Sequence, residues 1–259
     1  MFDEGTGPAI ILIPGVQGRW EWMKPALREL QKRCRTVTYT LSGDLGSEMK
    51  YDPAIGFDNY IRQLDDVFEK TGLDRAALCG VSYGGFIAVR YAALRPERVT
   101  SLIIASSPSP GWVPSKEQQR YIARPWISAP AFVLTAPLRI WPEVRAAFDT
   151  PADRLMFLAR HGMRAVTAPM MPRVMAGRVR LQQEMDFAPD CAEVKAPTLV
   201  VTGDDQLDRI VPPEITRRYC RMIPGAQYAR MEGTGHLGSL TRSAQFSELV
   251  SRFVYANRQ

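Results

Sequence analysis

Short continuous apolar runs alternate along the chain with stretches whose apolar residues follow helical spacing. The continuous runs are those expected of strands buried on both faces, and they occupy residues 7–13, 36–41, 76–79, 99–105, 197–202 and 226–231. Stretches that read as helices lie between and after them, at 57–70, 86–94, 213–222 and 244–255. Because parallel strands need crossover helices between them, the pattern predicts an α/β fold with a doubly wound, mostly parallel sheet.

This alternation is interrupted between residues 106 and 196. The segment holds five prolines from Pro108 to Pro130 and three more by Pro151, together with three of the five tryptophans. Its apolar content is too high for a disordered linker, so we predict short helices joined by proline turns, among them 153–161 and 174–185. We expect residues 107–196 to form a helical cap, inserted into a core domain made of residues 1–106 and 197–259.

The composition is that of an ordinary globular protein. Of 259 residues, 46% are hydrophobic and 23% are charged, which suffices for a substantial core in one domain with an insertion. No apolar run approaches the roughly 20 residues of a membrane span. The first residues lack the basic start and the apolar region of an export signal. We therefore expect a cytoplasmic protein without a membrane span, and the oligomeric state stays open.

Charge and cysteine content argue against further classes of function. The net charge is +6, but the 33 basic residues are scattered and not interleaved with aromatics, so nucleic acid is not an expected partner. A positive surface would instead favour anionic substrates. The four cysteines lie far apart without a C-x-x-C pair, which argues against a cysteine metal site. We expect no metal and no cofactor, since the chain also lacks a dinucleotide fingerprint.

The stretch 80–85 reads Gly-Val-Ser-Tyr-Gly-Gly and lies between a predicted strand and a predicted helix. In this context a G-x-S-x-G turn exposes a serine at the end of a sheet. The flanking glycines avoid clashes with neighbouring backbone, and the N–H groups at the helix start face the serine, where they can stabilise an oxyanion. On its own the motif is equally consistent with a helix start capped by Ser82.

A nucleophilic serine needs a base and a group that orients the base. The chain has two histidines. His236 follows a predicted strand in a glycine-rich loop and can reach the strand ends, whereas His161 lies in the predicted cap. The orienting carboxylate is expected after the preceding strand, where the candidates are Asp204, Asp205 and Asp208.

Together these motifs resemble the α/β-hydrolase family over nearly the whole chain except the cap. The turn at 80–85 resembles the family's nucleophile elbow, and Gly235-His236 resembles its base. Residues 203–212 resemble the acid turn, whose pattern is G…D-x-x-V-P. The resemblance implies an α/β-hydrolase fold with Ser82 as nucleophile, His236 as base and no cofactor.

The resemblance also points to one of the three aspartates. The spacing to Val211-Pro212 fits Asp208 as the acid of the triad. The loop from Gly203 to Asp208 is longer than the commonest family pattern, so Asp205 remains the second choice.

Two departures from the family pattern concern the sheet and its first turn. Pro14-Gly15 stands where the family usually has His-Gly. The family's oxyanion donors are the backbone N–H groups that correspond to Val16 and Tyr83, and this change leaves both in place. Only a few residues precede Gly7, where the family has further antiparallel strands. We therefore expect an N-terminally shortened sheet that lacks one or two strands, or a sequence whose start is missing.

We therefore predict a serine hydrolase that cleaves a small to medium, partly apolar carboxylic ester through an acyl-enzyme. The cap is expected to supply the pocket walls, with candidate substrate-binding residues Trp112, Trp126, Trp141 and Phe157. A carbon–carbon bond hydrolase or a cofactor-free perhydrolase would use the same triad and stays open as an alternative. So does a non-catalytic ligand-binding protein on the same fold.

Overall fold

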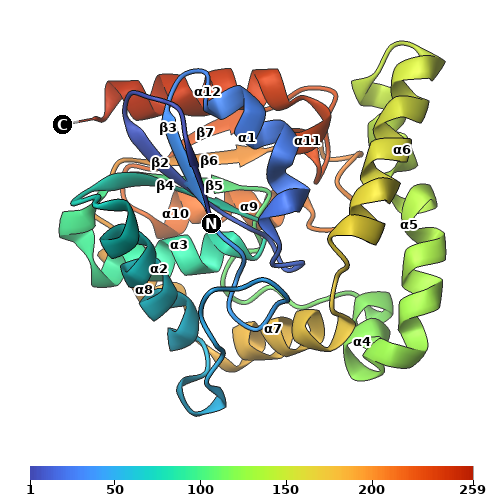
Figure 1. Ribbon diagram of the computed structural model, residues 1–259, viewed down its shortest axis with the longest axis horizontal. Coiled ribbons are helices and arrows are strands. Elements are labelled where there is room, and N and C mark those ends of the chain that lie inside the picture. Colours follow the sequence, from blue (N-terminus) through green and yellow to red (C-terminus); the bar gives the residue numbers. More distant parts are fainter. Residues whose placement is uncertain (259) are drawn as a thin grey trace.

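The computed structural model describes residues 1–258 and contains a seven-stranded sheet. Its strands are β1 (Phe2–Glu4), β2 (Ala9–Ile13), β3 (Arg35–Thr38), β4 (Ala76–Val81), β5 (Val99–Ala105), β6 (Thr198–Thr202) and β7 (Gln227–Arg230). They lie in the order β1-β3-β2-β4-β5-β6-β7, and all neighbours except β1 and β3 run parallel. The predicted doubly wound, mostly parallel sheet is confirmed (Figure 1).

β1 is the one strand that the apolar pattern does not reveal. It has three residues and pairs antiparallel with β3 at the edge of the sheet, Phe2 opposite Thr38. Arg35 on β3 donates to the Asp3 carboxylate at 2.7 Å, which adds a cross-strand ion pair to the short ladder. Within residues 1–258 the sheet therefore carries a single antiparallel strand, next to β3.

Successive residues of β2 point into two separate cores, which explains its continuous apolar run. Ile11 and Ile13 pack in the core beneath α2 (Asp58–Thr71), α3 (Gly84–Leu94) and α8 (Ala188–Glu193). Ile10 and Leu12 pack in the core beneath α1 (Lys24–Leu30) and α12 (Ser243–Ala256). Figure 1 shows these two groups of helices on opposite faces of the sheet.

Three short helices complete the core. The single helix predicted over 213–222 is divided into α9 (Pro213–Arg217) and α10 (Tyr219–Met222), with Arg218 between them. α11 (Gly238–Thr241) follows the loop that holds His236. After β2, a 3₁₀ turn at Trp20–Met23 leads directly into α1.

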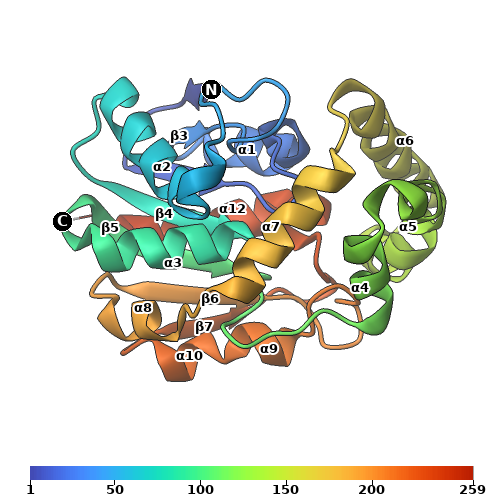
Figure 2. The same cartoon turned by 90° about the horizontal axis from the view of Figure 1, so that it is seen from below.

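Four helices follow β5 in the chain before α8. They are α4 (Lys116–Ala123), α5 (Pro125–Ala147), α6 (Pro151–Thr167) and α7 (Pro172–Glu184). In both Figure 1 and Figure 2 the first three lie beyond one end of the sheet, away from α2 and α8, and the fourth runs from them back toward α2 and α8. All belong to the range 107–196. The last part of that range behaves differently, because Phe187 and Cys191 pack in the core beside α3.

The expectation of short helices joined by proline turns is wrong for α5. This helix runs through Pro130, Pro137 and Pro142 without a break over 23 residues. Each proline removes one N–H from the helical ladder, and the three are spaced more than one turn apart, so the intervening bonds can form. The prolines at 125, 151 and 172 instead begin helices, where a missing N–H costs nothing.

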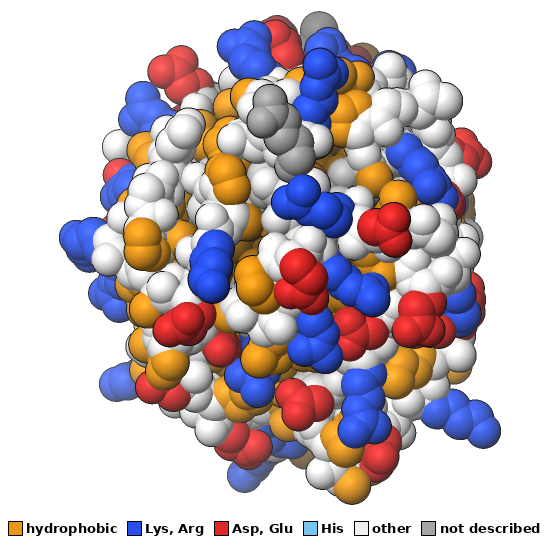
Figure 3. Space-filling model, turned by 90° about the vertical axis from the view of Figure 1, so that its left-hand side faces the viewer, with side chains coloured by type: hydrophobic (Ala, Val, Ile, Leu, Met, Phe, Trp, Pro, Cys, Tyr) orange, Lys and Arg blue, Asp and Glu red, His pale blue; other side chains and the backbone are white. Residues whose placement is uncertain are grey.

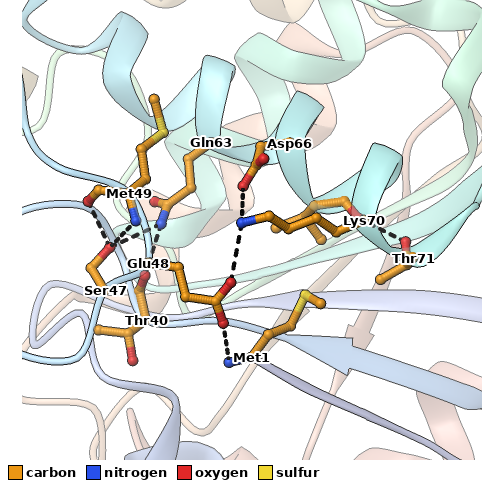
Figure 4. Close-up of polar contacts among 10 residues, drawn as sticks. Met1, Thr40, Ser47, Glu48, Met49, Gln63, Asp66, Lys70 and Thr71 are labelled. Carbon is orange, nitrogen blue, oxygen red and sulfur yellow. Dashed lines mark hydrogen bonds and ion pairs between the residues drawn. The ribbon is translucent and has the colours of Figure 1, made fainter.

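Polar contacts hold the loop between β3 and α2 (Figure 4). The Gln63 amide on α2 donates to the Thr40 carbonyl oxygen at 2.9 Å. Glu48 in the loop forms an ion pair with Lys70, also on α2, at 3.1 Å. These contacts fix a loop that carries Asp44 into the interior, next to the candidate site.

The surface away from α5 and α6 has mixed charge. Figure 3 shows basic and acidic side chains interspersed there rather than gathered in one patch. No helix within residues 1–258 combines the length and the apolar character needed to cross a membrane.

Candidate active site

Ser82 lies in a strained turn where β4 meets α3. Its φ of 54° falls in the left-handed region that residues other than glycine rarely adopt. Its N–H donates to the Ala105 carbonyl oxygen at 2.9 Å, which extends the β4–β5 pairing into the turn. A Cβ on Gly80 would lie 2.4 Å from the Gly84 oxygen, and one on Gly84 would lie 2.4 Å from the Ile13 oxygen. The close approach of these backbones therefore requires glycine at both positions.

His236 reaches Ser82 from the loop that follows β7. Its Nε2 lies 3.1 Å from Ser82 Oγ. Gly235 allows this approach, because a Cβ there would lie 2.6 Å from the Leu207 carbonyl oxygen. The second histidine, His161, stacks on a phenylalanine ring of α6 and takes no part in this group.

Asp208 completes the chain of contacts. Its Oδ2 lies 3.2 Å from His236 Nδ1. Its Oδ1 accepts hydrogen bonds from the backbone N–H groups of Ile210 at 3.0 Å and Val211 at 2.9 Å. The side chain is almost fully buried. One oxygen is therefore fixed by the backbone, which leaves the other aimed at the imidazole.

The other two candidate aspartates have different partners. Asp204 accepts a hydrogen bond from the Gly233 N–H at 2.7 Å and so fastens the start of the histidine loop. Asp205 has an exposed side chain and pairs with Arg217 at 2.8 Å. The structure thus brings Asp208 to His236 and leaves Asp205 at the surface.

Two opposed effects act on the pKa of His236. Burial lowers this pKa, whereas the charge of Asp208 and the hydrogen bond to it raise the pKa, with a smaller contribution from Glu143. The net pKa lies above the ordinary value of 6.5. The imidazole therefore holds a proton more readily than a histidine in water.

Glu143, which sequence reasoning did not single out, connects α5 to the histidine loop. It lies near the end of α5, where it is buried. One oxygen accepts from the Leu237 N–H at 3.0 Å, and the other accepts from the Thr241 hydroxyl at 3.0 Å. Burial raises the pKa of Glu143. Its only sequence signal was an acidic residue within an otherwise apolar helix.

The two predicted oxyanion donors lie beside the serine. Val16 and Tyr83 line the same cavity as Ser82. Within residues 1–258, neither of their backbone N–H groups donates a hydrogen bond. Val16 lies within a turn that is closed by the Gly18 N–H, which donates to the Gly15 oxygen at 2.9 Å. The turn therefore forms with Pro14 in front of it.

Arg178, on α7, holds the Val16 turn from behind. Its Nη1 donates to the Val16 carbonyl oxygen at 2.9 Å, and its Nη2 donates to the Ser42 carbonyl oxygen at 3.0 Å. Nη2 also forms an ion pair with Asp44 at 2.5 Å, and Nε donates to the Tyr60 hydroxyl at 3.2 Å. The side chains of Arg178 and Asp44 are 1% and 0% exposed. A buried cation thus links α7 to the turn that contains Val16.

Sequence reasoning missed this ion pair. Its one local signal is Gly18, which has a φ of 76°. A Cβ there would lie 1.8 Å from an Asp44 carboxylate oxygen. The glycine leaves the space that the Asp44–Arg178 pair occupies.

A cavity of about 430 Å³ opens above Ser82. Its walls come from α4, α5, α6 and α7, and its floor includes Val16 and Tyr83. Apolar side chains such as Phe132 and Met175 dominate the walls, and none of the described lining residues is charged.

Only one of the four predicted substrate-binding aromatics lines this cavity. Trp112 does so. Trp126 is 57% exposed, with the Arg173 guanidinium over its ring, and Trp141 is also exposed. Phe157 is buried in a small core with residues of α5 and α11. These three residues lie outside the described lining of the cavity, because α5 and α6 carry apolar residues on several faces and not only on the face toward the cavity.

The fold and the arrangement of Ser82, His236 and Asp208 agree with a match to a family model. The model, described as the alpha/beta hydrolase family, matches residues 10–249. The chain belongs to this family. The fold that the motifs implied for an alpha/beta hydrolase is thereby confirmed.

Several alpha/beta hydrolases resemble this one at low identity. The RutD protein of Klebsiella pneumoniae (strain 342), named as a carbamate hydrolase, is 23% identical over 247 residues, which cover 94% of this chain and 90% of that protein. An esterase from Exiguobacterium antarcticum has a TM-score of 0.79 at 18% identity, covering 98% of this chain and 94% of the other. A thermophilic esterase from Thermogutta terrifontis has a TM-score of 0.76 at 21% identity, covering 100% and 93%. At these identities the solved structures support the fold alone.

Proposed function

We propose that this alpha/beta hydrolase is a serine hydrolase that cleaves carboxylic esters through an acyl-enzyme on Ser82. The observation that carries the proposal is the continuous contact chain Ser82–His236–Asp208 at 3.1 and 3.2 Å. A serine hydroxyl becomes nucleophilic when a base accepts its proton and a carboxylate orients that base. The strained serine turn supports the same reading, because backbone strain gathers at functional sites.

The reaction follows from these positions. Ser82 Oγ attacks the ester carbonyl carbon while His236 Nε2 accepts its proton, and Asp208 stabilises the imidazolium that forms. The negative charge on the carbonyl oxygen is bound by the N–H groups of Val16 and Tyr83. The alcohol leaves with the proton from His236. A water molecule, deprotonated by His236, then attacks the acyl-enzyme and releases the acid and free Ser82.

The size and lining of the cavity support an ester with a bulky apolar part. We propose that α4–α7 act as a cap over the site, with the core resuming at α8. Pockets of roughly 300–1,000 Å³ hold drug-sized ligands, and this one has about 430 Å³. Carbamate, the substrate named for the RutD relative, is far smaller and polar. A mostly apolar wall of this size matches it poorly, so an ester with a medium-sized acyl or alcohol group fits better.

The first test is labelling with a fluorophosphonate probe. A stoichiometric adduct located on Ser82 by mass spectrometry, together with turnover of short- and medium-chain p-nitrophenyl esters, is the expected result. A folded protein that forms no adduct and turns over no ester would refute the proposal. A non-catalytic binding protein would then be the better description.

The choice of acid gives a separate prediction. We expect Asp208→Asn to lower kcat for ester hydrolysis on the order of a hundred- to ten-thousand-fold, because the amide favours the wrong tautomer of His236. The matched control is Asp205→Asn, which removes the same charge from an exposed residue and should leave kcat within about twofold. If Asp205→Asn proves the damaging change, Asp208 is not the acid.

The raised pKa of His236 predicts the pH dependence. Only neutral imidazole can accept the serine proton, so kcat/KM should rise with pH and have its midpoint above 6.5. In Asp208→Asn the charge that raises the pKa is gone, while burial still lowers it, so the midpoint should move down. A midpoint that stays in place in this variant would mean that another group controls the acid limb.

A further inference from the structure

Gln182 is a buried amide without a partner in the wall of the cavity. It lies on α7, is 4% exposed and lines the cavity above Ser82. Within residues 1–258 its side chain forms no hydrogen bond, although a carboxamide can donate two and accept two. The amide lines the cavity, so its donors and acceptor are open to a ligand there. A ligand that satisfies this amide therefore gains affinity over one that does not.

Two other polar side chains around the cavity, those of Gln118 and Tyr121, are already engaged. The Gln118 amide donates to the Ile210 oxygen at 3.0 Å and accepts from the Ser115 N–H at 2.7 Å. The Tyr121 hydroxyl donates to a carboxylate of its own helix at 3.2 Å. Among the three amide and phenol side chains that α4 and α7 bring to the cavity, Gln182 is thus the one left without a protein partner.

The charge around Gln182 restricts what this amide can bind. No described lining residue of the cavity carries a charge. One turn before it on α7, Arg178 is committed to Asp44 and to backbone oxygens behind the Val16 turn. A carboxylate or ammonium on the ligand would therefore be buried without a counter-charge, which is strongly unfavourable. The group that meets Gln182 must be uncharged.

We infer that Gln182 determines specificity by binding an uncharged hydrogen-bonding group on the substrate, a hydroxyl or a carbonyl carried by an otherwise apolar chain. This inference rests on the proposed ester hydrolysis and narrows its substrate class. It also replaces the expectation of anionic substrates drawn from net charge, because the positive charge lies outside the cavity. Substrates with a charged group on the same chain should be poor.

The test compares p-nitrophenyl esters of straight-chain acids with matched esters that carry a hydroxyl, a ketone or a carboxylate at successive chain positions. The proteins are the native chain, Gln182→Met, which keeps the side-chain shape, and Gln183→Met, the same change at the neighbouring exposed residue. In the native protein one position of the hydroxyl or ketone should raise kcat/KM about tenfold over the plain ester. This preference should disappear in Gln182→Met and persist in Gln183→Met.

Failure of the inference can be told apart from failure of the proposed function. If Ser82-dependent hydrolysis occurs but Gln182→Met keeps the native preference, Gln182 has no role in specificity. A preference for the carboxylate esters would also overturn the inference. If no ester is hydrolysed, the binding of alcohols to the Ser82→Ala variant still tests the role of Gln182. In Ser82→Ala, 1,6-hexanediol should raise the melting temperature more than 1-hexanol does. Adding Gln182→Met to Ser82→Ala should abolish this difference. Equal shifts from the two alcohols in Ser82→Ala alone would refute the inference.

Discussion

Replacing Ser82 by alanine is expected to lower kcat for ester hydrolysis by a factor on the order of a thousand to a million. The hydroxyl is the attacking group, and the remaining oxyanion donors and pocket supply only residual rate enhancement. Steady-state hydrolysis of a medium-chain p-nitrophenyl ester measures the effect. His236→Ala should lose a similar factor, and the double variant should lose little more, because the two residues act as one unit.

A matched serine variant separates this loss from general damage. Ser243→Ala changes a serine at the start of α12, outside the lining of the cavity, and should retain native kcat. Ser82→Ala keeps the Cβ and should unfold at about the native temperature. If Ser82→Ala stays active while folded, the nucleophile lies elsewhere.

Of the substitutions proposed for this protein, Arg178→Met should lower the free energy of unfolding the most. The change leaves Asp44 as an uncompensated charge in the interior, which costs about 3–5 kcal/mol of unfolding free energy. Both side chains are essentially inaccessible to solvent, so water does not screen the loss. Denaturant unfolding of the variant measures it. The Val16 turn also loses a donor at 2.9 Å, so fluorophosphonate labelling of Ser82 should slow down in the folded fraction.

A double variant provides the control for this prediction. Arg178→Met combined with Asp44→Asn removes both charges, and it should be more stable than Arg178→Met alone because no unpaired charge remains. If the double variant is as unstable as the single one or less stable, the ion pair does not account for the effect of Arg178.

The core of the fold could be predicted because its signals are local. A strand buried on both faces must be apolar at every position, and β4 and β5 have this pattern over nearly their whole length. The serine turn is specified by Gly80 and Gly84, whose neighbours exclude a side chain. The strand-turn-helix context of Ser82 could therefore be read from the sequence alone.

The choice among the three aspartates needed the folded backbone. Asp208 and Asp205 lie on one loop, but only Asp208 accepts hydrogen bonds from the N–H groups of Ile210 and Val211. The resemblance to a family favoured Asp208, but spacing within a longer loop left Asp205 open. Only the path of the loop shows that Asp205 points to Arg217 at the surface.

Contacts between distant segments could not be predicted from one sequence. Arg178 and Asp44 lie far apart in the sequence, and neither position has a local pattern that identifies its partner. In α4–α7 the apolar pattern did not identify the residues that line the cavity. Ile127, Leu134 and Leu138 on α5 are each more than 70% exposed, so apolar character there does not mark the wall of the cavity. This is why three of the four predicted aromatic residues do not line it.

The small buried part of α5 has a consequence for how the ligand specificity of this protein can evolve. Of its 23 residues, only Glu143, Val144 and Ala147 are buried, and all three lie near its end. The earlier part of the helix forms one side of the binding space while contributing little to the core. Substitutions at such exposed positions usually alter stability by less than about 0.5 kcal/mol. Substitutions on α5 can therefore alter which ligands fit the cavity, while the group formed by Ser82, His236 and Asp208 stays unchanged.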